Sequence, residues 1–253
     1  IRRNALLNVC RQVCTIVFPF LTFSYASHTL GAEALGKYTF GQSIVSYFNC
    51  FCALGISDYA VREAAPLRGD PGKLKKFADE VFSIQLLLLI VSYAALFLLL
   101  GSWAKLRPYR KVILILSIQL ILTVAGADWV NTAFEDFFYL AVRYFVTASA
   151  CTAAVFYVVN GPQDVYWYTL FSMLCAAGGN LWNVFYIRRY VKPGVTMRLN
   201  VRKHLPPMLL FFCNSMALVI YLNADITILG MYADDAAVGT YSVATKIYLM
   251  AKA

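Results

Sequence analysis

Charged residues are scarce in this sequence. They make up 14% of its 253 residues, whereas 60% are hydrophobic, and the mean hydropathy is +0.64. A chain this apolar cannot cover itself with a surface that water tolerates. The composition therefore excludes an ordinary soluble protein and indicates a membrane protein.

Motifs that carry catalysis or bind metal are missing as well. The sequence has no HExxH motif, no nucleophile elbow and no glycine-rich phosphate loop after a strand. Its two histidines, His28 and His204, are expected in loops. The cysteines fall in apolar stretches without a histidine or second pair at zinc-like spacing, which favours packing roles for Cys10, Cys14, Cys50, Cys52, Cys151, Cys175 and Cys213. We therefore expect no enzyme activity, no cofactor and no metal site.

Both ends of the sequence resemble cuts in a longer one. The chain opens at Ile1 rather than Met, and it stops at Ala253 within an apolar stretch. The first apolar stretch follows arginines, as a signal peptide does, but it is too long and lacks a small-residue cleavage site. We therefore expect the first helix to remain in the membrane.

Seven apolar stretches follow one another, and each is long enough to cross a bilayer. A hydrocarbon core about 30 Å thick needs about 20 helical residues. The stretches lie near Ala5 to Ser27, Tyr38 to Tyr59, Ala78 to Leu100, Val112 to Trp129, Leu140 to Val159, Val165 to Ile187 and Leu205 to Met231, and an eighth begins near Val238. A β-barrel needs alternating segments of about ten residues, whereas Ile84 to Leu100 is a nearly continuous apolar run. The sequence predicts an all-α, polytopic membrane helix bundle.

Lysine and arginine are distributed unequally between the two sets of loops. With the N-terminus in the cytoplasm, fourteen fall inside: Arg2, Arg3, Arg62, Arg68, Lys73, Lys75, Lys76, Arg143, Arg188, Arg189, Lys192, Arg198, Arg202 and Lys203. Five fall outside: Lys37, Lys105, Arg107, Arg110 and Lys111. The positive-inside rule favours this orientation, although the cluster from Lys105 to Lys111 opposes it. The net charge of +9 then faces anionic lipid headgroups, and no nucleic-acid partner is expected.

A short motif occurs twice, after the first and after the seventh stretch. Ala34-Leu35-Gly36-Lys37-Tyr38 leads to Ile44, and Ala237-Val238-Gly239-Thr240-Tyr241 leads to Ile247, at a constant offset of 203 residues. Six intervening spans give both copies the same orientation, as in transporters built from parallel repeats. We therefore expect a parallel repeat of two six-helix bundles, with the first bundle over residues 1–200 and the start of the second, helices seven and eight, over residues 201–253.

Polar side chains recur at helical spacing on three of these stretches. They are Asn4, Asn8, Arg11, Thr15 and Thr22 on the first, Tyr38, Gln42, Ser46 and Asn49 on the second, and Asn214, Tyr221 and Asp225 on the seventh. The uncharged ones suit either hydrogen bonds between packed helices or the wall of a cavity. An ionisable group at depth costs at least about 2.5 kcal/mol, so Arg11, Asp225 and Lys246 need water, a partner or a substrate. Arg11 has the alternative of snorkelling to the headgroups.

Several segments resemble one family of membrane transporters. Leu54-Gly55-Ile56-Ser57-Asp58-Tyr59-Ala60-Val61-Arg62-Glu63 is similar to the end of the second span of the polysaccharide (O-antigen and capsule) flippases. Trp129 to Arg143, with Glu135-Asp136, Tyr139, Ala141 and Arg143 in register, resembles the loop before their fifth span. Asp225, Gly239-Thr240-Tyr241-Ser242 and Lys246-Ile247 resemble their seventh and eighth spans. The departures are Ala60 in place of a usual glycine and Asn131-Thr132-Ala133 in place of Phe-Gln-Gly.

The resemblance implies the multidrug/oligosaccharidyl-lipid/polysaccharide exporter fold, in the inner membrane of a bacterium. It implies that lipid-linked oligosaccharide repeat units, carried on undecaprenyl diphosphate, move from the inner to the outer leaflet by alternating access. Arg11 and Lys246 have the charge that a diphosphate needs, Asp225 suits Lys246 or a coupling ion such as a proton or sodium, and Gln42, Ser46, Asn49 and Asn8 offer hydrogen bonds to sugar. A lipid II flippase and a drug or cation antiporter are the alternatives. The antiporter would need carboxylates deep in the first bundle, whereas Asp58 and Asp128 are expected at span ends.

Overall fold

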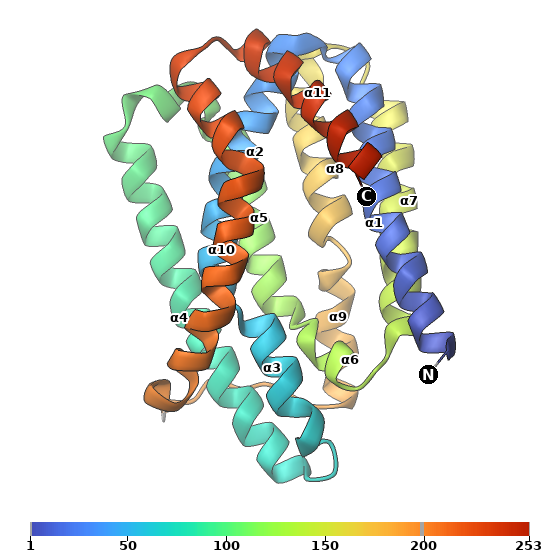
Figure 1. Ribbon diagram of the computed structural model, residues 1–253, viewed down its shortest axis with the longest axis vertical. Helices are drawn as coiled ribbons and strands as arrows, with labels where there is room; N and C mark the ends of the chain where they lie inside the picture. Colours follow the sequence, from blue (N-terminus) through green and yellow to red (C-terminus); the bar gives the residue numbers. More distant parts are fainter. Residues whose placement is uncertain (1, 198–199, 253) are drawn as a thin grey trace.

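The chain folds into an all-helical bundle (Figure 1), seen here in a computed structural model. It describes the backbone of residues 2–197 and 200–252 and the side chains of residues 8–197 and 200–250. The side chains of Arg2, Arg3, Asn4 and Arg198 therefore lie outside the described part. The α-helices are α1 (Arg2–Thr29), α2 (Gly31–Ala53), α3 (Ile56–Ala64), α4 (Pro71–Ser102), α5 (Arg110–Gly126), α6 (Trp129–Ala133), α7 (Phe137–Val158), α8 (Val165–Ala177), α9 (Asn180–Tyr186), α10 (Val201–Tyr232) and α11 (Asp235–Lys252).

In the part of the chain that the structure describes, seven helical segments are long and apolar enough to cross a membrane. They cover Asn8–Thr29, Gly31–Leu67, Pro71–Ser102, Ala104–Gly126, Phe137–Val158, Pro162–Arg189 and Val201–Tyr232. Each coincides with one of the seven predicted stretches, so the prediction of a polytopic helical bundle is confirmed. Most segments begin several residues earlier than the hydropathy alone indicated, because polar first turns at the ends of the bundle are still helical.

Two of the seven segments are broken near the same end of the molecule. Leu54 and Gly55 adopt left-handed backbone angles, with φ of 39° and 65°, and turn the chain from α2 into α3. Gly55 also lets α10 approach closely, because a side chain there would overlap the backbone carbonyl of Met208. The second break lies at Gly178 and Gly179, between α8 and α9. These breaks direct the short helices α3 and α9 toward the same end of the bundle as α6 (Figure 1).

The core is built around α5, which lies in the middle of the bundle (Figure 1). Ile113, Leu116 and Leu120 on this helix are fully buried, and they pack in one cluster with residues of α2, α4 and α8. On the remaining sides α1 packs along α7, and α10 packs along α2. The first helix and α10 therefore lie on opposite sides of the bundle in Figure 1.

The two copies of the repeated motif touch each other where α2 and α11 cross. A side chain on Gly36 would overlap the carbonyl of Asp235, and one on Gly239 would overlap the carbonyl of Ala32. Asp235 stands 203 residues after Ala32, and Gly239 stands 203 residues after Gly36, so the two contacts are reciprocal. Below this crossing α2 runs toward α10 and α11 runs toward α1 (Figure 1).

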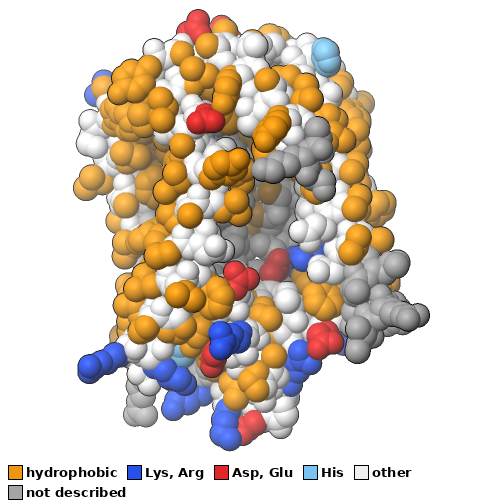
Figure 2. All heavy atoms as spheres, viewed as in Figure 1, with side chains coloured by type: hydrophobic (Ala, Val, Ile, Leu, Met, Phe, Trp, Pro, Cys, Tyr) orange, Lys and Arg blue, Asp and Glu red, His pale blue; other side chains and the backbone are white. Residues whose placement is uncertain are grey.

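Charged side chains gather at one end of the molecule. On the face shown in Figure 2, most lysines and arginines lie at the lower end, where α3 and the start of α4 are found, and apolar side chains cover the rest. Arg62, Arg68, Lys73, Lys75 and Lys76 belong to this end. This is the end for which a cytoplasmic location is predicted.

Candidate functional site

A hollow opens in the middle of the face shown in Figure 2. The structure also contains a cavity of about 190 Å³ lined by residues of α1, α2, α5, α8 and α11. Its polar wall comprises Thr22, Tyr38, Gln42, Gln119, Tyr168, Ser172 and Lys246. The lining thus combines hydroxyls and amides with one cation and no carboxylate, which suits a sugar or an anion better than a cation.

Lys246 projects from α11 into this cavity. Its Nζ lies 5.6 Å from the centre of the Phe23 ring on α1, a distance that allows a cation–π contact. Among the described residues no carboxylate lies within ion-pair distance of this amine. The positive charge is therefore free to meet an anionic group that enters the cavity.

Tyrosine rings stand next to Lys246 and form a second feature of this cavity. Tyr38 and Tyr168 meet edge to face with their centres 4.8 Å apart, and both line the cavity together with Gln42. Aromatic rings flanked by amides and hydroxyls are well matched to the apolar face and the hydroxyl rim of a sugar ring. Tyr38 and Gln42 are thus the two members of the predicted stripe on α2 that reach the cavity.

The other two members of that stripe lie differently. Ser46 donates a hydrogen bond of 2.7 Å to the carbonyl of Ser43 in its own helix. The Oδ1 atom of Asn49 is buried and accepts no hydrogen bond from the described residues. Neither residue lines the cavity that holds Lys246.

Asp225 belongs to a different hollow, between α10 and α11. This one measures about 320 Å³ and is lined by Tyr221, Tyr241, Thr245 and Tyr248 besides Asp225 itself. The hydroxyl of Tyr241 donates a hydrogen bond of 2.9 Å to the Asp225 carboxylate. The structure therefore gives Asp225 a tyrosine as its partner, whereas the sequence had suggested Lys246.

Arg11 lies near the N-terminal end of α1 and contacts Asn8 of the same helix. Its guanidinium donates a hydrogen bond of 3.2 Å to Asn8 Oδ1, and its Nε atom is buried without an acceptor among the described residues. Lys246 contacts Phe23, which lies twelve residues further along α1. At about 1.5 Å per residue this separates the two cations by about 18 Å along the helix. The structure thus does not bring Arg11 and Lys246 together.

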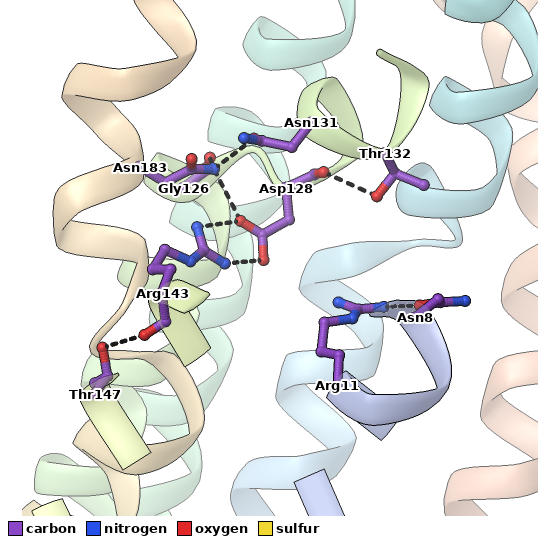
Figure 3. A network of polar contacts seen from close by, with 9 residues as sticks. All are labelled: Asn8, Arg11, Gly126, Asp128, Asn131, Thr132, Arg143, Thr147 and Asn183. Carbon is purple, nitrogen blue, oxygen red and sulfur yellow. Dashed lines mark hydrogen bonds and ion pairs between the residues drawn. The ribbon is translucent and has the colours of Figure 1, made fainter. Parts of the chain in front are cut away.

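A second arginine, which the sequence reading had counted only as a loop residue, lies at the level of Arg11 (Figure 3). Arg143 is on the second turn of α7, and its side chain is 9% exposed. It binds the carboxylate of Asp128 through two hydrogen bonds of 2.9 and 2.7 Å. Gly179 leaves room for the arginine stem, because a side chain there would crowd it. Two parallel hydrogen bonds fix the orientation of the Arg143 guanidinium and also pair its charge with the Asp128 carboxylate.

Asn183 of α9 completes the network around Asp128 (Figure 3). Its amide nitrogen donates to the Gly126 carbonyl at 2.6 Å, and lies 2.9 Å from both Asp128 Oδ1 and Asn131 Oδ1. The loop reaches this position because Ala127 and Glu135 adopt left-handed backbone angles, with φ of 44° and 58°. The network ties the ends of α5, α7 and α9 together beside the hollow.

His204 corrects the sequence reading, which expected it in a loop. The residue lies in the first turns of α10 and is fully buried, where it contacts Tyr59 and Glu80. The helix begins at Val201, before the expected start at Leu205, and continues through Pro206 and Pro207 in its second turn. Its partner Glu80 is a buried carboxylate that the sequence reading did not consider.

In the described part of the chain, seven candidate membrane spans and a polar cavity that holds Lys246 define a multi-pass membrane protein. The profile of the family described as "Polysaccharide biosynthesis protein" matches residues 1–253, and the chain belongs to this family. The spans and the family place it in the inner membrane of a bacterium.

One curated relative is similar to the chain over nearly all of its length. The chain is 23% identical over 256 residues to a protein of Escherichia coli (strain K12) named "Putative O-antigen transporter". That match covers 98% of this chain and 60% of the relative, so the chain spans less than two thirds of the relative's length. No solved structure is significantly similar to the chain.

Proposed function

We propose that this chain is the first half, and the start of the second half, of a flippase for lipid-linked oligosaccharide repeat units. Residues 1–200 form the first six-helix bundle, and residues 201–253 begin a second bundle of the same orientation. The reciprocal contacts of Gly36 and Gly239 support this repeat. If a two-fold axis relates α2 to α11, the residue that Gly36 contacts must be the repeat equivalent of the residue that Gly239 contacts, and Asp235 is the repeat equivalent of Ala32.

The observation that carries the proposal is Lys246, which has no ion-pair partner among the described residues, in a cavity of hydroxyls, amides and aromatic rings. A diphosphate and a hydrophilic sugar cannot enter hydrocarbon, so their carrier needs such a polar enclosure. Lys246 attracts the anionic headgroup, while Gln42, Tyr38 and Tyr168 accept the sugar. Arg11, held by Asn8, provides a second cation nearer the cytoplasmic mouth, and Ser46 and Asn49 extend the polar wall of α2.

Movement of the substrate then follows the alternating-access scheme. The cavity is lined by helices of the first bundle and by α11 of the second. Rotation of the second bundle relative to the first, about the crossing of α2 and α11, opens the hollow to one leaflet and then to the other. Asp225, bound to Tyr241 in the separate hollow between α10 and α11, is the residue that changes its partner when a coupling ion or a sugar arrives. The protein supplies no catalytic group in this scheme.

Two members of the same superfamily are the rival functions. A drug or cation antiporter would place carboxylates in the cavity, and the residues that line it include neither aspartate nor glutamate. A lipid II flippase differs only in the headgroup that it accepts. Reconstitution of the full-length protein in liposomes, with fluorescent lipid-linked O-antigen repeat or lipid II, separates these functions. We expect the O-antigen substrate to become accessible in the outer leaflet, and faster movement of lipid II would contradict the proposal.

A further inference from the structure

A buried polar chain joins α10 to the rest of the bundle, at the end predicted to be cytoplasmic. The Tyr59 hydroxyl of α3 lies 2.6 Å from His204 Nδ1, and His204 Nε2 lies 2.7 Å from Glu80 Oε2 of α4. The three residues are 3%, 0% and 7% exposed. Distances this short in a buried place mean that both contacts are hydrogen bonds with little competition from water.

Charge balance at this place depends on a proton. The described part of the chain offers Glu80 no lysine or arginine within ion-pair distance. Two lysines of α4 lie in the same groove: Lys75 is bound to Asp79 at 2.9 Å, and Lys76, one turn before Glu80, lies beyond ion-pair distance of it. A buried carboxylate without a cation is costly. Among the described residues, His204 is the basic group within ion-pair distance of Glu80, and it can neutralise the carboxylate by holding one additional proton.

The other charged groups around the pair do not replace this proton. On α3, Glu63 acts on Tyr59 and adds negative charge. On α4, Asp79 is already bound by Lys75 and by the Gly194 amide at 2.6 Å. On α10 itself, Arg202 and Lys203 are exposed to solvent, and Arg198 lies outside the described residues. The rings of Phe77 and Trp129 close the remaining side with apolar surface.

Both protonation states keep the hydrogen-bond chain intact. Without the additional proton, neutral His204 donates from Nε2 to the Glu80 carboxylate and accepts the Tyr59 hydroxyl at Nδ1, which leaves a net charge of minus one. With one proton added, either on the free carboxyl oxygen of Glu80 or on Nδ1 of His204, the pair is electrically neutral. Burial favours the neutral state.

Protons can reach the pair from one side. Glu80 lies in the wall of a groove of about 580 Å³ that also contains Lys75, Lys76, Asp79 and Thr196. The groove lies at the end of the molecule that carries the basic loops (Figure 2). Glu80 is thus the contact between water in the groove and the fully buried His204.

We propose that Glu80 and His204, with Tyr59 as positioning residue, form the binding site of the proton that couples transport to the proton gradient. This inference rests on the proposed transport function. The site joins α10, the first helix of the second bundle, to α3 and α4 of the first. The bound proton stabilises the packed arrangement. When α10 moves away, water reaches Glu80, the carboxylate ionises and the proton leaves.

The first test uses no substrate. Thermal unfolding of the full-length protein in lipid nanodiscs is measured between about pH 6 and pH 9, the range in which a histidine site gains or loses its proton. A group that holds its proton more firmly when folded contributes stability at low pH and loses it as the pH rises. We expect the wild-type protein to lose several degrees of melting temperature over this range, and His204→Gln and Glu80→Gln to be nearly independent of pH. His28→Gln, which removes the other histidine of this chain, should behave like wild type. Equal pH dependence in all four proteins would overturn the proposal.

Both glutamine variants preserve side-chain volume and hydrogen-bonding atoms, so we expect them to fold. Should either fail to accumulate, carbodiimide labelling of the unmodified protein carries the test, because the reagent adds to protonated carboxyls. Labelling of Glu80, measured by mass spectrometry, should level off toward pH 6, whereas labelling of the exposed Glu33 should change about tenfold for each pH unit between pH 9 and pH 6, as expected for an ordinary carboxyl. Labelling of Glu80 that runs parallel to that of Glu33 would count against the proposal.

The second test measures coupling. In liposomes, a pH gradient should accelerate flipping by the wild-type protein and by His28→Gln at least fivefold, and should not affect Glu80→Gln or His204→Gln, which retain exchange without a gradient. If the wild-type protein moves no lipid-linked sugar at all, the proposed function fails, while the unfolding experiment still decides on the proton site. Acceleration of both glutamine variants to the wild-type extent would refute the coupling.

Discussion

Removal of the charge of Lys246 should abolish transport without unfolding the protein. Lys246 has no ion-pair partner among the described residues, and its Nζ lies 5.6 Å from the Phe23 ring centre. A lysine about 4 Å from one phosphate charge contributes about 1 kcal/mol in water and about 4 kcal/mol at an effective dielectric constant of about 20. Lys246→Gln should therefore weaken substrate binding by about 5-fold to about 1,000-fold, since each 1.4 kcal/mol is a factor of ten. Lys246→Arg should retain part of the activity, because the charge remains.

The assay is the display of surface polysaccharide in cells that depend on this protein, together with the amount of protein in the membrane. A matched control is available in Lys111, whose Nζ lies 5.5 Å from the ring centre of Tyr166 at the other end of α5 from Asp128. Both substitutions remove a cation–π contact of about 0.5 to 2 kcal/mol, but only Lys246 lines the cavity. Lys111→Gln should therefore display normal polysaccharide. Normal display by Lys246→Gln at matched protein level, alone and combined with Arg11→Gln, would refute the role of the cationic cavity.

The remaining predictions concern the network, the glycine contact and the orientation. Arg143→Ala should lower the unfolding free energy by about 1 to 3 kcal/mol, which is less than for a fully buried pair because Asp128 keeps 42% of its side chain exposed. Arg68→Ala, which breaks an exposed ion pair, should cost less than about 1 kcal/mol. Equal costs of the two substitutions in a thermal unfolding assay would contradict the structural role of Asp128. Gly36→Ala should destabilise the bundle by about 1 to 3 kcal/mol because its methyl group overlaps the Asp235 carbonyl. Gly101→Ala, whose methyl group faces open space, should not change the stability. A Gly36→Ala protein as stable as wild type would disprove the close contact. Single cysteines at Asp164 and Asp234, in a background without native cysteines, should react with an impermeant thiol reagent in intact cells, and labelling of one at Lys75 instead would reverse the orientation.

The sequence was sufficient for the membrane spans but not for the polar contacts between them. An apolar run such as Ile84 to Leu100 has no stable environment outside a membrane or a core, so its length alone predicts a span. The stripe on α2 was partly informative, because helical periodicity identifies the face of Gln42 but not which of its neighbours faces the cavity. Lys246 was identified for a physical reason, the cost of a charge at depth, and the structure places it in the cavity.

Hydropathy and helical periodicity could not predict that Arg143 binds Asp128. The two residues are fifteen positions apart, and they meet because Ala127 and Glu135 adopt left-handed angles, which glycine or asparagine would have signalled but alanine and glutamate do not. The buried His204 was missed because polar residues and two prolines at the start of α10 resemble a loop. Its partners Tyr59 and Glu80 lie more than a hundred positions away in the sequence, so only the packing of α10 against α3 and α4 reveals the cluster.

If α11 rotates as a rigid body, its close contact with α2 at Gly36 and Gly239 is the pivot. Lys246 lies seven residues beyond Gly239 and the helix ends at Lys252, thirteen residues beyond it, which correspond to arms of about 10 Å and about 20 Å. A rotation of about 15° about the glycine contact, the size of a typical rigid-body step, would move Lys246 by about 3 Å and the end of the helix by about 5 Å. In the proposed transport scheme, the short arm would keep the lysine near its ligand while the long arm widens or narrows the mouth. A pivot placed at the far end of the helix would leave that end, and with it the mouth, in place and would move Lys246 by only about 2 Å.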